Sequence, residues 1–244
     1  MQVSDITAYF INLDDSTERR MNTERQLDDL GIQHHRVVAI TPHQSAYSEG
    51  LAKFAPHGPA AATSSDPVAA AVNLSFFKML YSALSSSRPY VLLVEDDVRF
   101  EPNFMEKVRE LVQIVGEFDS LHLSVGCVRK GELFTTDALV MGDPWPCYPL
   151  HSTIWGNLPM SQRTAELPII PGEPISILIP RKQLSKYIYL VENFHMLNPW
   201  RPIDVMLGYV NRVCGLRALC CVNPQPIQNM EVASDTAKVK AELQ

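Results

Sequence analysis

Three consecutive carboxylates, Glu95, Asp96 and Asp97, are the residues whose type and spacing could do chemistry. They follow the apolar run 90–94, which has the pattern of a strand buried on both faces of a parallel sheet. Because side chains alternate along a strand, we expect Glu95 and Asp97 on one side and Asp96 on the other. Two carboxylates at a strand end suit Mg²⁺ or Mn²⁺, which leave positions open for phosphate oxygens. The plainer alternative is a solvated, acidic turn.

Two adjacent arginines form a second group of candidates. Arg19 and Arg20 fall in the first turns of an expected helix. Acidic side chains are favoured at that end of a purely structural helix, so the arginines indicate an anionic ligand nearby. The residues leave open the alternative that both arginines are simply solvated.

The elements that must position these residues alternate along the chain. Strands are expected at residues 6–13, 36–40, 90–94, 121–125, 175–179 and 216–222. Helices are expected at 16–30, 67–85, 103–115, 181–191 and 203–213. A strand, a helix and a strand at this spacing form a parallel unit. The sequence therefore predicts an α/β fold with a mostly parallel central sheet flanked by helices.

The first helix carries signals at both ends. Asp15 with Glu18 three residues later resembles a capping box, and Gly31 stands at the expected C′ position. Its apolar face is expected to consist of Met21, Leu27 and Leu30.

Three stretches lack the periodicity of helices and strands. Residues 41–66 are expected to form a loop, and a loop of that length is generally a functional lid or mobile. The segment 142–174 is rich in Pro and Gly and is expected to leave the sheet; its aromatics could stack on a sugar or pack the loop down. The chain from Asn223 is expected to be a tail.

Composition narrows the classes of function. The chain has 244 residues, 46% of them hydrophobic, and a net charge of −6, which argues for one globular domain and against nucleic acid as a partner. Five cysteines without a Cys-x-x-Cys pair indicate neither a disulfide framework nor a zinc site. We find no signal peptide or membrane span, so the expected location is cytoplasmic, with at most peripheral membrane contact.

Four stretches of the chain match one known pattern in order and type. They are Ile11-Asn12-Leu13-Asp14 with the paired arginines, Leu93-Val94-Glu95-Asp96-Asp97-Val98, Pro202-Ile203-Asp204-Val205, and the ending Pro224, Pro226 and Gln228 with Ser234-Asp235. Together they resemble glycosyltransferase family 25, which includes bacterial lipopolysaccharide galactosyl- and glucosyltransferases and related collagen galactosyltransferases.

The resemblance implies an architecture and a reaction. It implies a GT-A-like single domain over 1–244, with a nucleotide-sugar-binding half (1–125), an acceptor-side half (126–230) and a tail (231–244). The implied reaction moves galactose or glucose, with inversion, from UDP-galactose or UDP-glucose to a hydroxyl of a saccharide or glycoconjugate acceptor. Lipopolysaccharide biosynthesis is the implied setting.

The resemblance also assigns residues. Glu95 and Asp97 would hold Mn²⁺ or Mg²⁺. The residues implied to bind the nucleotide sugar are Asn12, Leu13, Arg19, Arg20, Ser75 and Asp96. Asp204 would be the general base that takes the acceptor proton, although Asp at this place is equally a helix N-cap. Asp96 and Glu173 are the next carboxylates to consider.

Two departures from the family pattern keep other functions open. Phe76 stands where the family has His, and Thr41 follows the second strand where the family has an acid. They permit an altered donor or a non-catalytic, glycosyltransferase-like binding protein. A metal-dependent phosphohydrolase is a further alternative, disfavoured because the seven histidines are scattered.

Overall fold

The computed structural model describes residues 1–54, 67–123, 126–129, 132–135, 147–149, 176–197, 203, 207, 210, 216, 218–221 and 227–229. The strands are β1 Ile6–Asn12, β2 Gln33–Val38, β3 Tyr90–Glu95, β4 Val98–Arg99, β5 Ser120–His122, β6 Gly126–Arg129, β7 Glu132–Thr135, β8 Cys147–Pro149, β9 Ser176–Pro180, β10 Ala218–Cys221 and β11 Ile227–Asn229. The helices are η1 Val3–Asp5, a 3-10 turn, followed by α1 Thr17–Asp29, α2 Ser45–Phe54, α3 Pro67–Ala83, α4 Phe104–Val115 and α5 Arg181–Leu197.

The main sheet has seven strands in the order β2-β1-β3-β9-β5-β10-β8. β1 pairs in parallel with both β2 and β3, and β5 pairs in parallel with β10. β9 is antiparallel to β3 and to β5, so β5 and β10 run in the direction of β1. The expected α/β fold with a mostly parallel sheet and flanking helices is confirmed, as is the parallel β1-α1-β2 unit.

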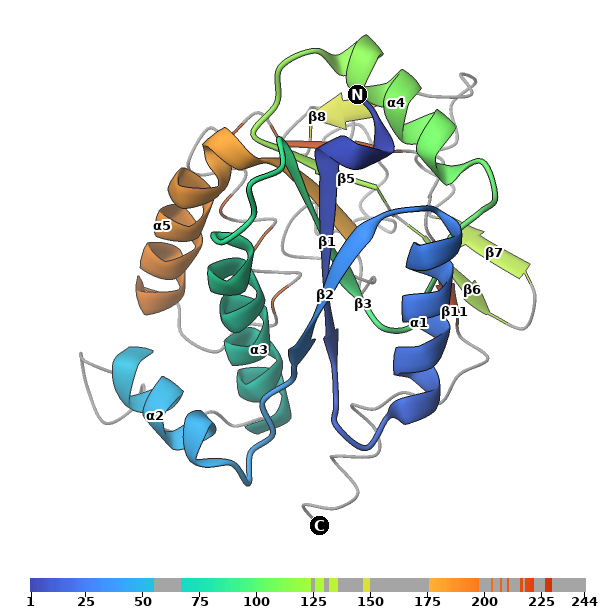
Figure 1. The fold of residues 1–244 in the computed structure, drawn as a ribbon. Helices are drawn as coiled ribbons and strands as arrows, with labels where there is room; N and C mark the ends of the chain where they lie inside the picture. The colour runs from blue at the N-terminus through green and yellow to red at the C-terminus, as the bar shows by residue number, and fades with distance from the viewer. Residues whose placement is uncertain are drawn as a thin grey trace, which may run out of the picture.

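The helices cover the two faces of this sheet (Figure 1). α3 and α5 pack on one face, and α1 with α4 packs on the other. Alternate residues of β3 serve the two faces: Val91 and Leu93 join the α3/α5 cluster, and Leu92 and Val94 join the α1/α4 cluster. This division explains why the run is apolar without interruption.

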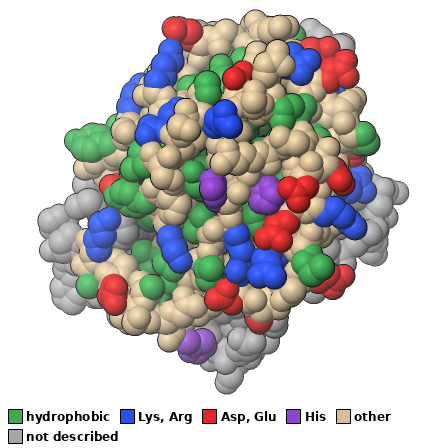
Figure 2. Space-filling view, in the orientation of Figure 1, with side chains coloured by type: hydrophobic (Ala, Val, Ile, Leu, Met, Phe, Trp, Pro, Cys, Tyr) green, Lys and Arg blue, Asp and Glu red, His purple; other side chains and the backbone are tan. Residues whose placement is uncertain are grey.

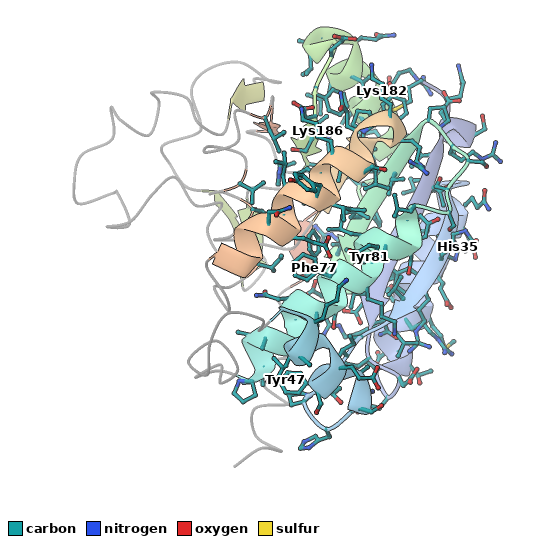
Figure 3. All side chains as sticks on the ribbon, turned by 90° about the vertical axis from the view of Figure 1, so that its left-hand side faces the viewer. His35, Tyr47, Phe77, Tyr81, Lys182 and Lys186 are labelled. Atoms are coloured by element: carbon teal, nitrogen blue, oxygen red, sulfur yellow. The ribbon has the colours of Figure 1, made fainter. Side chains whose placement is uncertain are left out.

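Aromatic and charged side chains of α3 and α5 lie on this face of the sheet. Phe77 is buried on α3, and Tyr81 lies one turn further along the same helix (Figure 3). On α5, Lys182 and Lys186 lie one turn apart and pair with Glu117 and Asp119 respectively. The ion pairs tie the start of α5 to the segment that enters β5.

The edge strand β2 is covered by polar side chains. Charged and histidine side chains gather over β2 and α1 on the face seen in Figure 2. Charged side chains discourage pairing of an edge strand with a second chain. None of the helices in the described part of the chain is both long and apolar enough to cross a membrane.

Four sequence expectations need correction. The segment 41–66 is not all loop, because α2 occupies Ser45–Phe54, and its residues from 55 to 66 lie outside the described part. The segment 142–174 contains β8, which returns to the sheet beside β10. The expected tail from Asn223 contains β11. The strand expected at 36–40 lies at Gln33–Val38, because its register with β1 ends at Val38.

The first helix also differs from its expectation. α1 begins at Thr17, so its N-cap is Ser16 and not Asp15 as expected, and the Ser16 side chain makes no capping hydrogen bond. The turn before α1 is closed instead by the amide of Ser16 bonding to the carbonyl of Leu13 at 3.1 Å. Leu27 is buried, but Met21 is 60% exposed. Gly31 has a φ of 70°, as expected of a helix C′ residue.

Candidate functional site

An acidic turn follows β3 at the carboxyl edge of the sheet. β3 ends at Glu95, and Asp96 with Asp97 forms the turn that leads into β4. Both turn carboxylates contact Arg19: its Nη2 lies 2.8 Å from Asp96 Oδ1 and 3.1 Å from Asp97 Oδ2. The expected opposite orientation of these neighbours is therefore wrong, because a turn and not a strand sets their directions.

Asp96 is held from two further directions. The Nδ2 group of Asn12 donates to Asp96 Oδ2 at 2.6 Å, and Thr23 Oγ1 donates to the Asp96 carbonyl at 2.9 Å. Asp96 is only 6% exposed. A buried carboxylate is tolerated when charged or polar groups bond to it, and here β1 and α1 supply those groups.

The face of α1 toward this turn is polar. Arg19, Thr23 and Gln26 are spaced i, i+4 and i+7, so they lie on one side of the helix. Gln26 donates to the carbonyl of Val98 at 3.1 Å and accepts from the amide of Phe100 at 2.9 Å. α1 is thus hydrogen-bonded to Asp96 in the acidic turn, to Val98 at the start of β4 and to Phe100 just after β4. This i, i+4, i+7 polar spacing is the signal by which Thr23 and Gln26 could have been found in the sequence.

Arg36 extends the network to the edge strand. Its Nε donates to Asn12 Oδ1 at 2.9 Å, and its Nη2 contacts Asp14 Oδ1 at 2.7 Å. Asn12 therefore bridges Arg36 on β2 and Asp96 beyond β3. The sequence expectations omitted Arg36; a charged residue inside the strand next to β1 was the available signal.

The region that contains this network matches a known family. The sequence model of glycosyltransferase family 25 (LPS biosynthesis protein) matches residues 5–133, which is more than half of the chain. The chain belongs to glycosyltransferase family 25. A search of curated protein sequences found no match. Membership of the family indicates a glycosyltransferase, with a sugar donor and an acceptor as partners, and places the chain among proteins of lipopolysaccharide biosynthesis.

The structure brings together some of the residues that match the family pattern and leaves others apart. Asn12, Arg19, Asp96 and Asp97 form one contact network. Glu95, the last residue of β3, stands in register with Ile11.

Three further predicted residues make contacts elsewhere among the described residues. Arg20 lies 3.9 Å from Glu24 on the same helix, and about a third of each side chain is exposed. Leu13 contributes its carbonyl to the turn before α1. The Ser75 hydroxyl accepts from the amide of Ile40 at 2.8 Å and donates to the carbonyl of Ala71 at 2.7 Å. Ser75 therefore fixes the chain that leaves β2.

Two predicted residues fall in the undescribed part of the chain. Asp204 and Glu173 lie outside the described residues, so the general-base assignment stays a prediction. Ile203, Leu207 and Val210 are described: they are helical and buried in the α3/α5 cluster, which agrees with an apolar helix face there. β11 pairs Gln228 with Val98, so the matching segment near the C-terminus lies beside the strand that follows the acidic turn.

One buried histidine lies further along the same edge. His122 ends β5 and stands in register with Ile177 of β9. It is 4% exposed, and burial lowers its pKa to about 3. Its imidazole is consequently neutral at pH 7 and cannot supply a positive charge to an anionic ligand.

The acidic turn offers oxygen ligands for a divalent cation. Two carboxylate oxygens already converge on one nitrogen of Arg19, so their directions suit a single shared cation. Among the described residues, no group of three or more His, Cys, Asp or Glu side chains is placed to hold a metal. Mg²⁺ sites commonly use one or two carboxylates and take their other ligands from phosphate and water. Two carboxylates therefore supply as many protein ligands as such a site commonly has.

Proposed function

We propose that this family 25 protein transfers a hexose, galactose or glucose, from a nucleoside-diphosphate sugar to a hydroxyl of a saccharide or glycoconjugate acceptor. The proposal includes dependence on Mn²⁺ or Mg²⁺, a GT-A-like arrangement and inversion at the anomeric carbon. The observation that carries it is the convergence of Asp96, Asp97 and Arg19 at the carboxyl edge of β3, inside the region that matches the family.

The position of the acidic turn supports a nucleotide site. Ligands of open α/β sheets bind beyond the carboxyl ends of the strands. β1, β2 and β3 are parallel and end together, with Asn12 in register with Val38 and Ile11 in register with Glu95. The first turn of α1 starts at the same edge, so its backbone amides add to the positive potential that favours a diphosphate.

The chemistry of transfer requires stabilisation of the leaving group. Departure of a nucleoside diphosphate develops negative charge on its β-phosphate, which a bound divalent cation would neutralise. Asp97, with Glu95, is proposed to hold that cation. Arg19 and Arg20 would add positive charge from α1, and Asn12 would keep Asp96 fixed while the ligand binds. Asp204 is proposed as the base that removes the acceptor proton.

The departure at Phe76 is compatible with this function. Phe76 is fully buried in the α3/α5 cluster, so its ring replaces a polar residue within the apolar core. The neighbouring Ser75 keeps its contact with the chain after β2. The family position is thus occupied by a packing residue, and the acidic turn is built from other elements.

The proposal is tested with a panel of nucleotide sugars in Mn²⁺, Mg²⁺ or chelator, by following release of the nucleoside diphosphate and thermal stabilisation. We expect one UDP-hexose to stabilise the protein only with metal. Asp97→Asn should lower turnover by about 10²-fold or more while the protein stays folded. The control is Asp119→Asn, which removes a carboxylate paired with Lys186 before β5 and should leave turnover unchanged. Full activity in chelator would contradict the metal dependence.

The base assignment needs a separate substitution. Asp204→Asn caps a helix about as well as Asp but cannot take a proton, so turnover should fall about 10²-fold with donor affinity nearly unchanged. Normal turnover would remove Asp204 from the mechanism and direct the test to Asp96 and Glu173.

A further inference from the structure

Arg19 occupies the point on which the two carboxylates converge. Its Nη2 is within 3.1 Å of oxygens from both Asp96 and Asp97. All three side chains are largely withdrawn from water, with exposures of 10%, 8% and 13%. Ion pairs with so little exposure are screened less than surface pairs. The guanidinium is therefore a strong local counter-ion of the acidic turn.

A guanidinium and a divalent cation cannot share this point. Mg²⁺ binds carboxylate oxygens at about 2.0–2.1 Å and keeps near-octahedral geometry. A cation at that distance from the same oxygens would lie against the Arg19 nitrogen, where two positive charges repel strongly at low dielectric. Binding of the metal through Asp96 or Asp97 thus requires Arg19 to release at least one carboxylate.

Asp96 is fixed by two further groups that do not depend on Arg19. It is held by Asn12 and Thr23, which belong to β1 and α1. When Arg19 leaves, these bonds keep Asp96 in place. Asp97 can then turn toward an incoming cation. Arg19 itself stands in the first turn of α1, where a released guanidinium stays near the helix end that favours anions.

We propose that Arg19 is an exchangeable counter-ion, a positioning residue that holds the acidic turn in its metal-free form and is displaced from it by Mn²⁺ or Mg²⁺. After displacement the guanidinium is available to bind the donor diphosphate. Metal binding and the release of Arg19 toward the phosphates therefore occur together. This inference rests on the proposed function, and it adds that the Arg19 guanidinium and the metal ion compete for the same carboxylate oxygens.

The competition is tested with MnCl₂ alone, by calorimetric titration of the full chain without any nucleotide. Removing the competing cation in Arg19→Gln should lower the Kd for Mn²⁺ by about tenfold. The matched control is Arg25→Gln, an exposed arginine of the same helix whose Nη2 donates to Asn22 Oδ1, and its Kd should equal that of the wild type. Asp97→Asn added to Arg19→Gln should abolish the tight binding.

A second variant guards against loss of folding. Arg19→Lys keeps a positive charge but loses the planar fork, so it should bind Mn²⁺ more tightly than the wild type by a smaller factor. The Tm increase caused by Mn²⁺ should also be larger in Arg19→Gln than in the wild type. An unchanged or weaker affinity in both Arg19 variants, or no Mn²⁺ binding in any variant, overturns the inference.

The outcomes separate this inference from the proposed function. Tighter Mn²⁺ binding in Arg19→Gln without sugar transfer by the wild type would keep the competition and reject the glycosyltransferase. Metal-dependent transfer with equal Mn²⁺ affinity in Arg19→Gln and Arg25→Gln would keep the function and reject the competition.

Discussion

The core under α3 and α5 and the acidic turn beside α1 are built by different means. Under α3 and α5 the buried surface is aromatic and aliphatic, with Phe76, Phe77 and Met79 at most 2% exposed. Facing α1, the carboxyl end of the sheet carries a network in which Arg19 and Thr23 meet the acidic turn. Apolar packing stabilises without regard to the direction of individual atoms, whereas each contact of the α1 network depends on direction.

This difference indicates where substitutions should be tolerated. Volume-conserving exchanges under α3 and α5 should be tolerated, because total volume and patterning decide such a core. Exchanges on the polar side of α1 should not be, because one missing partner leaves a buried polar group without its bond. Four predictions sharpen this comparison.

The largest expected loss is on the apolar face. Phe76→Ala removes a fully buried ring and should lower the free energy of unfolding by about 4 kcal/mol, measured by urea denaturation. The control is Ile114→Ala, which truncates a side chain that is 66% exposed and should cost less than about 0.5 kcal/mol. Equal costs would mean that α3 contributes little to the core.

The burial of His122 should also make the free energy of unfolding fall in acid. Burial lowers the pKa of His122 to about 3 in the fold, from an ordinary value of 6.5. The unfolded chain therefore binds the proton first as the pH falls, and stability is complete above about 6.5 and lost progressively down to about 3. Between pH 7 and pH 4 the loss should be about 3 kcal/mol.

The test compares the pH slope of unfolding free energy rather than its absolute value. His122→Gln should remove most of that slope, and His43→Gln, at an exposed position, should leave it in place. A wild-type slope that persists in His122→Gln would assign the acid sensitivity to other groups.

A smaller effect is expected on the polar side of α1, at the acidic turn. Thr23→Val keeps the shape of the side chain but removes the hydrogen bond to the Asp96 carbonyl, so it should cost about 1–2 kcal/mol. Thr17→Val, at an exposed position of the same helix, is the control. If the two variants lost the same stability, the bond to Asp96 would not be what holds α1 to the turn.

The smallest expected effect on global stability is at α2. Lys53 of α2 lies 3.4 Å from both the Tyr81 hydroxyl of α3 and Glu192 Oε1 of α5. Burial and the hydrogen bond to Glu192 raise the pKa of Tyr81, so its hydroxyl remains a donor at neutral pH. Lys53→Met should cost less than about 0.5 kcal/mol but should speed proteolysis within Ser45–Phe54, because it frees α2 locally.

The proteolysis test has a control and a ligand arm. Lys182→Met, which removes an exposed pair with Glu117, should leave cleavage of α2 unchanged. Nucleotide sugar with Mn²⁺ should slow cleavage if the segment 41–66 closes as a lid. Identical digestion of all samples would count against both the Lys53 contact and the lid.

The sequence predicted the parts of the fold that rest on periodicity. The uninterrupted apolar run at 90–94 predicted a strand buried on both faces, and β3 is that strand. α2 was missed because its stability depends on tertiary contact: a Cβ at Gly50 would lie only 2.7 Å from Leu74 Cδ2, so the helix packs closely on α3. β8 and β11 have three residues each, too few for any period, and their partners are distant in sequence.

The site was predicted in composition but not in geometry. The acids and Arg19 stood out as candidates by residue type and position in the chain, whereas Asn12 was a candidate only through the resemblance to the family. Their mutual orientation was not readable, because the alternation rule fails where β3 ends at Glu95 and a turn begins. Arg36 was missed because its role depends on the pairing of β1 with β2, which brings it within 2.9 Å of Asn12.

The acidic turn joins two different sheets. β3 belongs to the seven-stranded sheet, and β4, which follows the turn, belongs to the four-stranded sheet β4-β11-β6-β7. Because only Asp96 and Asp97 connect β3 to β4, any displacement of one strand relative to the other has to be accommodated at these two residues. β11 pairs with β4 from far along the chain, so the strand that follows the acidic turn is held in place by residues more than 100 positions away in the sequence.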